Sequence, residues 1–346
     1  GDVNPSGRTV DTWATDFTAD PSYQIIGSFS YDNVTTSSAS LGGQVGEFNR
    51  YYTDYQEGVY IGYRYYETAD VMDDAFTYGT LDGKGATATT GAVTYPFGYG
   101  LSYTSFSQQI VGYDDAGDDI NVQVAVTNTG DTYAGKDVVQ LYYGAPYTQL
   151  DIDDKVEKPV ANLIAFDKTE LLAPGESQTL TLSFSKEDMA SYCYTHANPD
   201  GTTGCYLLES GDYQISLRSD SHDVIETRTT TIPDTIWYDG SDDAHIRTSD
   251  KDAQSELDDA GNATDQAMTG TYVAATNEFQ TSSDYMNEES TILSRADWEG
   301  TKPQTVANRT KSLDQKYADQ LGQDTTFDVA TDPTYGDVEG SLVYES

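Results

Sequence analysis

The clearest pattern in the chain is an alternation of apolar and polar residues in the middle of the sequence. Ile120, Val122, Val124 and Val126 alternate with polar or small residues, and the run stops at the turn residue Gly130. A period of two predicts a strand with one buried face. Comparable patterns recur at residues 137–144, at 163–185 on either side of the turn Ala173-Pro174-Gly175-Glu176, at 210–221 and at 224–232. Short strands separated by turns about every eight to twelve residues predict a β-sandwich.

Two segments dense in tyrosine and glycine precede this region. The first, VYIGYRYY, has apolar residues at alternate positions and predicts a strand over residues 59–66. In the second, Pro96 fixes its own φ angle, while Gly98 and Gly100 allow backbone conformations that other residues avoid. The second segment is therefore predicted to be a rigid connector.

The rest of the chain has little periodicity. Residues 1–54 have only scattered apolar anchors, and the run Thr35–Gly46 predicts a flexible loop. Residues 68–93 are predicted to be a surface insertion, in which an acidic, solvated loop is favoured over a cation site at Asp70, Asp73 and Asp74, because the ligand spacing of a calcium loop is missing.

The segment 233–346 contains 24 acidic and 7 basic residues, which favours an extended, weakly ordered segment. We expect it to pack on another domain at intervals, through Trp298, Tyr335, Leu342, Val343 and Tyr344.

The charge of the chain narrows the choice of partners. With 58 acidic and 18 basic residues, the formal net charge is −40, which would repel nucleic acid and an anionic membrane surface, so neither is expected as a partner. No apolar run approaches the roughly 18 residues of a transmembrane helix. The 28 tyrosines and the abundant threonine and glycine favour a mainly β protein.

Cysteine and histidine are scarce. Cys193 and Cys205 flank a turn-rich segment that predicts the tip of a hairpin, where a disulfide would form in an oxidising compartment; the sequence leaves this open. One nearby histidine falls short of the usual four zinc ligands, so no metal and no cofactor are predicted. The three histidines, His196, His222 and His245, are interpreted as surface residues.

Several of these segments resemble one known family. EGVYIGYRYYE (57–67), followed by YPFGYGLSYTSF (95–106), resembles the end of the second domain of glycoside hydrolase family 3 enzymes, which are β-glucosidase-like. Asn4-Pro5-Ser6-Gly7 resembles the element that precedes those motifs in the family. VTNTG, KDVVQLYY, KPVANLIAFDKTELLAPGES and SGDYQISL then resemble the family's fibronectin type III-like domain, in the same order.

The resemblance implies a mainly β fold with three parts. Residues 1–102 would be the C-terminal portion of an α/β sandwich domain, 103–232 a fibronectin type III-like (Ig-like) β-sandwich, and 233–346 an extended acidic connector or tail that packs on other domains. The chain is expected to be a piece of a longer polypeptide. Its tail would suit a connector to a catalytic barrel beyond Ser346, as in relatives that carry the barrel last; the alternative is the usual order, with the barrel first.

The resemblance also implies an activity, the hydrolysis of β-glucosides or related glycosides by a retaining mechanism with two carboxylates. The family's acid/base glutamate would lie before residue 1. Asp297 superficially matches the nucleophile motif, but it lacks the apolar barrel strand that should precede it, so no catalytic residue is predicted in this chain.

The expected partners follow from the implied activity. They are the remaining barrel and sandwich domains of the same enzyme, in the same chain or a nicked partner, and a glycoside substrate bound through those domains; a homo-oligomer is left open. The alternative function is a non-catalytic fibronectin-like module that acts at a surface or binds carbohydrate.

The motif residues are assigned structural roles. Glu57 and Arg64 are predicted to form a charge-assisted pair, favoured over a contact with sugar. Tyr65, Pro96, Gly98 and Gly100 complete this structural motif, and no substrate-binding residue is assigned.

Overall fold

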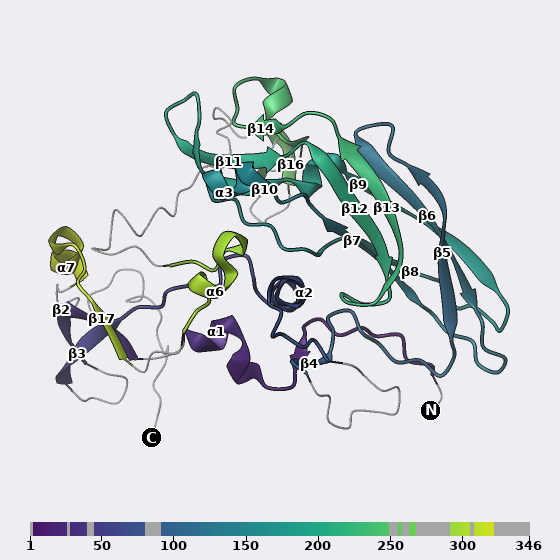
Figure 1. Cartoon of the computed structure of the whole chain (residues 1–346), viewed down its shortest axis with the longest axis horizontal. Helices are drawn as coiled ribbons and strands as arrows, with labels where there is room; N and C mark the ends of the chain where they lie inside the picture. The colour runs from purple at the N-terminus through teal and green to yellow at the C-terminus, as the bar shows by residue number, and fades with distance from the viewer. Residues whose placement is uncertain are drawn as a thin grey trace, which may run out of the picture. The chain divides into compact units, whose positions relative to one another are not determined.

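The computed structural model of the chain describes residues 3–25, 28–39, 45–79, 91–248, 255–257, 263–267, 291–304 and 308–321 (Figure 1). The chain divides into two compact units. The first comprises Gly1–Tyr23, Tyr55–Phe279 and Thr291–Pro303, and the second comprises Gln24–Asp54, Gln280–Ser290 and Gln304–Ser346. Each unit is described by itself. Among the described residues, every helix is too short or too polar to cross a membrane.

A β-sandwich is the largest part of the first unit. One sheet has the order β13-β12-β7-β8 and the other β5-β6-β9, with antiparallel pairing throughout. The strands are β5 (Phe106–Asp114), β6 (Asp119–Asn128), β7 (Val138–Gly144), β8 (Asn162–Lys168), β9 (Ser177–Ser185), β12 (Gly211–Arg218) and β13 (Val224–Ile232).

The core between these sheets confirms the predicted alternation. Ile120, Val122, Val124 and Val126 of β6 are all 0% exposed. On the facing sheet, alternate residues of β7 and β12 enter the same apolar cluster. The predicted β-sandwich is confirmed.

A smaller sheet, β10-β11-β14, also belongs to the first unit. It consists of β10 (Ser191–Ala197), β11 (Thr203–Leu208) and β14 (Ile236–Tyr238). The tip of its hairpin is closed by hydrogen bonds from Gly201 N to Asn198 O (3.0 Å) and from Asn198 N to Thr202 O (2.9 Å). Other short elements of the first unit are α3 (Gln149–Asp154), η2 (Lys186–Met189), η3 (Asp243–His245), β15 (Ser255–Leu257) and β16 (Ala263–Ala267).

The tyrosine-rich motif forms a helix, so the strand predicted over residues 59–66 is wrong. Helix α2 (Tyr63–Met72) begins after Gly62, whose φ of 53° turns the chain into it. Tyr65, Tyr66 and Ala69 are buried at helical spacing. Packing of this face outweighs the strand preference of tyrosine, because β-propensity depends on its surroundings.

The segment after the helix is less exposed than predicted. Thr68 and Ala69 are 0% exposed, and Tyr78 and Val93 are buried, so an entirely solvated insertion over 68–93 is wrong; residues 80–90 lie outside the described part. The N-terminal segment pairs with it through β1 (Trp13–Ala14) and β4 (Val93–Tyr95). Two short helices follow β1, namely η1 (Phe17–Ala19) and α1 (Pro21–Gln24).

The predicted anchor Trp298 is confirmed as a core residue. It lies at the start of α6 (Trp298–Thr301), which follows η4 (Arg295–Asp297), and it is 4% exposed. Its ring makes an edge contact with Tyr60 (5.2 Å between centroids) and stacks on Tyr65 (5.9 Å). The anchors predicted at Tyr335, Leu342, Val343 and Tyr344 lie outside the described residues, as does much of the acidic segment.

The second unit contains a three-stranded sheet of order β17-β2-β3, formed by β2 (Ser28–Ala39), β3 (Val45–Tyr51) and β17 (Asn308–Lys311), with helix α7 (Gln315–Leu321). The flexible loop predicted over 35–46 is therefore wrong for residues 35–39 and 45–46, which pair in this sheet; residues 40–44 lie outside the described part. Val34, Leu313 and Ala318 form a small apolar cluster here.

One buried cation organises the region between α3 and β11. The Nζ atom of Lys158, whose side chain is 1% exposed, forms ion pairs with Glu209 and with Asp151 (2.6 Å to Oδ1). Thr148 closes the cluster by donating to Asp151 Oδ2 from its backbone (2.7 Å) and to Glu209 Oε1 from its hydroxyl (2.5 Å). Removing the cation would leave two carboxylates buried without it.

The connector between α2 and the sandwich depends on Gly98. Its φ is 79°, and a Cβ atom there would lie 2.1 Å from Gln140 Oε1. Gln140 is held in place, because its Nε2 atom donates to Gly98 O and Ser219 O (3.0 Å each). The connector therefore lies directly against β7.

We expect Lys158→Met to lower the free energy of unfolding by about 3–5 kcal/mol at pH 8, measured by urea denaturation, because it leaves buried charge unpaired. Burial raises the pKa of Asp151 to about 6. A carboxyl whose folded-state pKa is raised favours folding when protonated, and that contribution is lost as the pH rises through about 6. The loss of unfolding free energy caused by the substitution should therefore be smaller at pH 5.

Lys136→Met is the control, since the Lys136–Glu170 pair is exposed and should be worth less than about 1 kcal/mol. Equal effects at the two lysines would contradict this assignment.

We expect Gly98→Ala to destabilise the chain by about 2–5 kcal/mol, because it adds a steric clash to the cost of a left-handed backbone. Gly175→Ala is a matched control: Gly175 has the same φ of 79°, but nothing lies within 4 Å of its added Cβ. The control should cost only about 1–2 kcal/mol. Similar losses in the two variants, compared by thermal unfolding, would show that the contact with Gln140 is unimportant.

Candidate functional site

Several buried polar side chains of the first unit lie on helix α2 or beside it. Glu67, on the second turn of α2, is 5% exposed. Its carboxylate accepts hydrogen bonds from the Tyr78 hydroxyl (2.7 Å), the Ser221 hydroxyl (3.0 Å) and His222 Nδ1 (3.0 Å). We refer to these four residues as the Glu67 cluster.

The Glu67 cluster joins α2 to the loop between β12 and β13. The ring of His222 stacks on that of Tyr78, with 3.6 Å between centroids, and Ser221 N donates to Phe97 O of the connector (2.8 Å). Burial raises the pKa of Tyr78, and the adjacent Glu67 raises it further, so this phenol remains a donor. The prediction that His222 is a simple surface residue is wrong.

His222 is subject to two opposing effects. Burial lowers its pKa, but the hydrogen bond to Glu67 and the charge of that carboxylate outweigh burial, and the pKa of His222 lies above its ordinary value. The imidazolium is therefore favoured in the folded state. This arrangement holds a proton but has no free nucleophile, because the Ser221 hydroxyl donates to Glu67.

The NPSG element and the connector form a clasp beside this cluster. Asn4 donates to Ala134 O (3.0 Å) and accepts from Tyr103 N (2.8 Å), so its amide joins the start of the chain to the sandwich. Thr9 bonds the connector at three points: its hydroxyl to Pro96 O (2.6 Å), its carbonyl to Gly98 N (2.9 Å) and its N–H to Tyr99 O (2.8 Å). The structure thus brings together the motif residues Pro96 and Gly98.

Gly100 has a similar steric reason to be glycine. A Cβ atom at this position would lie 2.6 Å from Gly7 O and 2.7 Å from the Arg8 side chain. Arg8 in turn pairs with the buried Asp137 at the start of the sandwich. The NPSG element, the connector and the start of the sandwich, which stand apart in the sequence, therefore meet at one place in the first unit.

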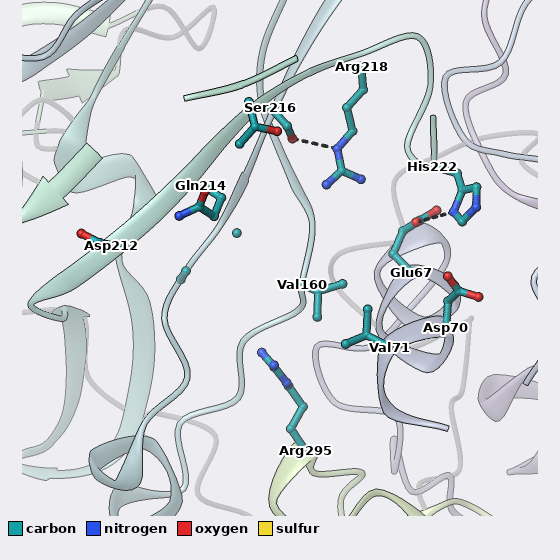
Figure 2. A pocket seen from close by; sticks show the side chains of 13 residues that line it. Glu67, Asp70, Val71, Val160, Asp212, Gln214, Ser216, Arg218, His222 and Arg295 are labelled. Atoms are coloured by element: carbon teal, nitrogen blue, oxygen red, sulfur yellow. Dashed lines mark hydrogen bonds and ion pairs between the residues drawn. The ribbon is translucent and has the colours of Figure 1, made fainter. Parts of the chain in front are cut away.

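A cavity of about 530 Å³ lies between α2 and the outer face of β12 (Figure 2). Along β12, Tyr213, Ile215 and Leu217 point into the core, so the residues between them point outward. The cavity is lined by these outward residues of β12, by residues of α2 and by Arg295 of the returning segment: Glu67, Asp70, Val71, Gly144, Ala145, Val160, Asp212, Gln214, Ser216, Arg218, His222, Thr227 and Arg295.

The predicted pair of Glu57 and Arg64 does not form, which corrects that interpretation. Glu57 is 6% exposed and accepts a hydrogen bond from the Ser22 hydroxyl at 3.5 Å. Burial raises the pKa of Glu57, so it holds its proton more readily than usual. Arg64 lies in the first turn of α2 instead, and none of the ion pairs of the described residues joins the two.

Cys193 and Cys205 lie opposite one another across β10 and β11, and both are free and 0% exposed. Burial raises the pKa of the Cys205 thiol to about 12. The disulfide stays a prediction, since the hairpin places the two residues as a pair without bonding them.

Asp297, the residue that superficially matches a nucleophile motif, has a structural role. Its carboxylate accepts from Gly300 N (3.0 Å) at the start of α6, and its carbonyl accepts from the Thr301 hydroxyl (2.7 Å). Among the described residues, no cluster of three or more histidine, cysteine, aspartate or glutamate side chains could hold a metal ion.

Of the residues that line the cavity, the sequence analysis named Asp70 and His222 but assigned neither to a binding site. Glu67 was available as the only carboxylate at the end of the tyrosine-rich motif, where an acidic group among aromatic side chains indicates a buried partner. Arg218 and Arg295 gave no comparable signal, because they are 77 positions apart and meet only through the fold.

Comparisons with known proteins agree with this arrangement. Residues 137–221 match the family model of the fibronectin type III-like domain. The chain is 36% identical over 240 residues to beta-glucosidase A of Butyrivibrio fibrisolvens, and the alignment covers 64% of this chain and 23% of the relative. It is 30% identical over 240 residues to a beta-glucosidase of Kluyveromyces marxianus, covering 69% of this chain and 22% of that protein.

A solved structure is also similar. The beta-glucosidase of Paenibacillus barengoltzii aligns with a TM-score of 0.48 and 35% identity, covering 68% of this chain and 21% of that protein. The chain spans less than a quarter of the length of the curated relatives named here. Over about two thirds of its length, where the motifs and the matched domain lie, the chain belongs to the C-terminal region of the family 3 glycoside hydrolases.

Proposed function

We propose that this chain supplies scaffold and accessory domains to a retaining glycoside hydrolase that cleaves β-glucosides or related glycosides. The observation that carries the proposal is the 30–36% identity to beta-glucosidases over 240 residues, together with the small share of those enzymes that the chain covers. A share of 22–23% is consistent with an accessory role beside a larger catalytic part.

The catalytic pair of carboxylates is proposed to lie outside this chain. A retaining glycosidase needs two carboxyl groups about 5 Å apart that can both reach the substrate. The carboxylates at the best-defined positions of the first unit are already engaged: Glu67 accepts three hydrogen bonds, and Asp151 and Glu209 pair with Lys158. Asp297 caps a helix. These engagements support a structural role for the chain.

The chain's parts have distinct proposed roles. Residues 1–102 would complete an α/β sandwich domain, 103–232 would form the fibronectin type III-like buttress, and 233–346 would connect to other domains. The remaining barrel and sandwich domains of the same enzyme would be its partners, and the glycoside would bind through them. The clasp at Asn4, Thr9 and Gly98 supports this division, because it fastens the first part to the second.

We expect the native polypeptide that contains this sequence to hydrolyse 4-nitrophenyl β-D-glucopyranoside with a rate enhancement of about a million-fold or more, as enzymes do. The 346-residue chain alone should release nitrophenol no faster than buffer. The measurement is initial rate by absorbance, with the intact mass of the native polypeptide determined on the same sample.

Two results would contradict this proposal. Hydrolysis by the 346-residue chain alone that disappears in Asp297→Asn would place a catalytic carboxylate within it. A native polypeptide with no activity on β-glucosides or related glycosides would instead support the non-catalytic surface or carbohydrate-binding module.

A scaffold role requires α2 to stay fastened to the sandwich, and the Glu67 cluster makes that contact depend on pH. Because the folded-state pKa of His222 is raised, its contribution to stability is fully present below the ordinary value of about 6.5 and is lost as the pH rises through the higher folded-state value. We therefore expect His222→Gln to reduce the loss of unfolding free energy between pH 6 and pH 8 seen in the unmodified chain.

Urea denaturation at the two pH values measures this effect. His245→Gln is the control, since its partner Asp242 is largely exposed on a short 3₁₀ helix and should contribute little. If the pH dependence is the same with and without His222, the imidazolium does not stabilise this contact.

A further inference from the structure

The cavity beside α2 has polar groups that the fold does not use. Arg218 Nε donates to the Ser216 hydroxyl (2.8 Å) and its Nη1 to Ser221 O, which leaves Nη2 without a hydrogen bond among the described residues. Arg295 Nη1 donates to Lys158 O (2.9 Å), and its guanidinium lies over the Tyr147 ring, 4.4 Å from the centroid. Figure 2 shows the two guanidinium groups entering the cavity from opposite sides.

Further polar groups with unused hydrogen-bonding capacity line the cavity beside the two arginines. Asp70 lies on the exposed side of α2 and has no hydrogen bond to any described residue, so its carboxylate is available. Gln214 uses its amide oxygen to accept from the Thr229 hydroxyl (3.2 Å), which leaves its amide N–H groups free. Asp212 accepts from Thr231 through Oδ1 (2.6 Å), leaving Oδ2. Planar donor and acceptor groups therefore surround one space.

Small apolar groups form the rest of the lining. They belong to Val71 of α2, Val160 and Ala145, and Figure 2 labels the two valines. A volume of about 530 Å³ is within the range of small-molecule sites, and such sites usually combine apolar surface with a few placed polar groups.

The balance of charge selects the class of ligand. Glu67 and His222 line the cavity as an ion pair, so their charges offset one another. The other charged groups of the lining are two guanidiniums and the carboxylates of Asp70 and Asp212. An anion would approach Asp70 and Asp212, and a cation would approach both arginines. A neutral molecule whose rim both donates and accepts hydrogen bonds satisfies both signs without repulsion.

We propose that this cavity is a non-catalytic binding site for a neutral saccharide of one or two pyranose units. Adjacent hydroxyls would accept from Arg218 and Arg295 and donate to Asp70, while the C–H face of a ring would lie on Val71 and Val160. Guanidinium and carboxylate groups suit this role because hydrogen bonds to charged partners are the stronger ones. The inference goes beyond the proposed hydrolysis and does not depend on it, since no bond of the saccharide is broken here.

Titration of the 346-residue chain with cellobiose tests the site, with binding followed by isothermal calorimetry and by backbone amide shifts. We expect saturable binding with shifts at Gln214, Ser216 and Val71. Asp70→Ala should weaken it about tenfold or more, because a hydrogen bond to a charged group is lost. Val71→Trp should abolish it by filling the cavity from an exposed helical position, where the side chain is now 64% exposed.

Asp74→Ala is the matched control, because Asp74 is exposed just beyond α2 and does not line the cavity. It should bind cellobiose like the unmodified chain. A near-ultraviolet circular dichroism spectrum like that of the unmodified chain shows that a variant is folded. If Val71→Trp does not fold, the binding affinity of Asp70→Ala tests the proposal.

Three outcomes would overturn the proposal: no saturable binding of cellobiose, binding that Asp70→Ala leaves unchanged, or displacement of cellobiose by acetate or sulfate at equal concentration, which would indicate an anion site. Hydrolysis of nitrophenyl glucoside by the native polypeptide is scored separately, so failure of this site and failure of the proposed function are distinguishable.

Discussion

The buried carboxylate of Glu67 is the constraint on which the first unit depends. A carboxylate that is 5% exposed must be satisfied by donors, and three side chains from two other parts of the chain provide them. Tyr78 follows α2 in sequence, whereas Ser221 and His222 belong to the loop that follows β12. Satisfying this one group therefore requires the tyrosine-rich helix to lie against the sandwich.

The connector and the NPSG element also hold the region around α2 against the sandwich, through close steric contacts. Gly98 and Gly100 are glycines because the side chain of Gln140 and the backbone of Gly7 occupy the space that a Cβ atom would need. Hydrogen bonds from Asn4 and Thr9 then close the clasp. A helix held this closely to a sheet leaves little freedom, and the cavity between α2 and β12 is what the two surfaces do not fill. Its unused polar groups are the reason to expect a ligand there.

The scaffold role proposed for the chain requires a stable interior, in which buried charges are paired. Lys158, Asp151 and Glu209 show how the fold uses charge in its interior: each is matched, and each would be costly alone. The acidic surface is a separate matter, since a net charge of −40 concerns solubility and partners more than fold. An accessory domain that must stay folded beside a larger catalytic part benefits from an interior of this kind.

The sequence by itself determined the sandwich, because Ile120 to Val126 and the later strands alternate with a period that only a half-buried sheet satisfies. It also determined the family, through motifs whose order and spacing match. The tertiary structure decided the rest. The strand expected over residues 59–66 does not form, and Tyr63–Tyr66 begin a helix instead, because burial of Tyr65 against Trp298, more than 200 residues away, outweighs local preference. The cavity could not be predicted for the same reason: Arg218, Arg295 and Asp70 come from distant segments, and only the packing of those segments places them around one space.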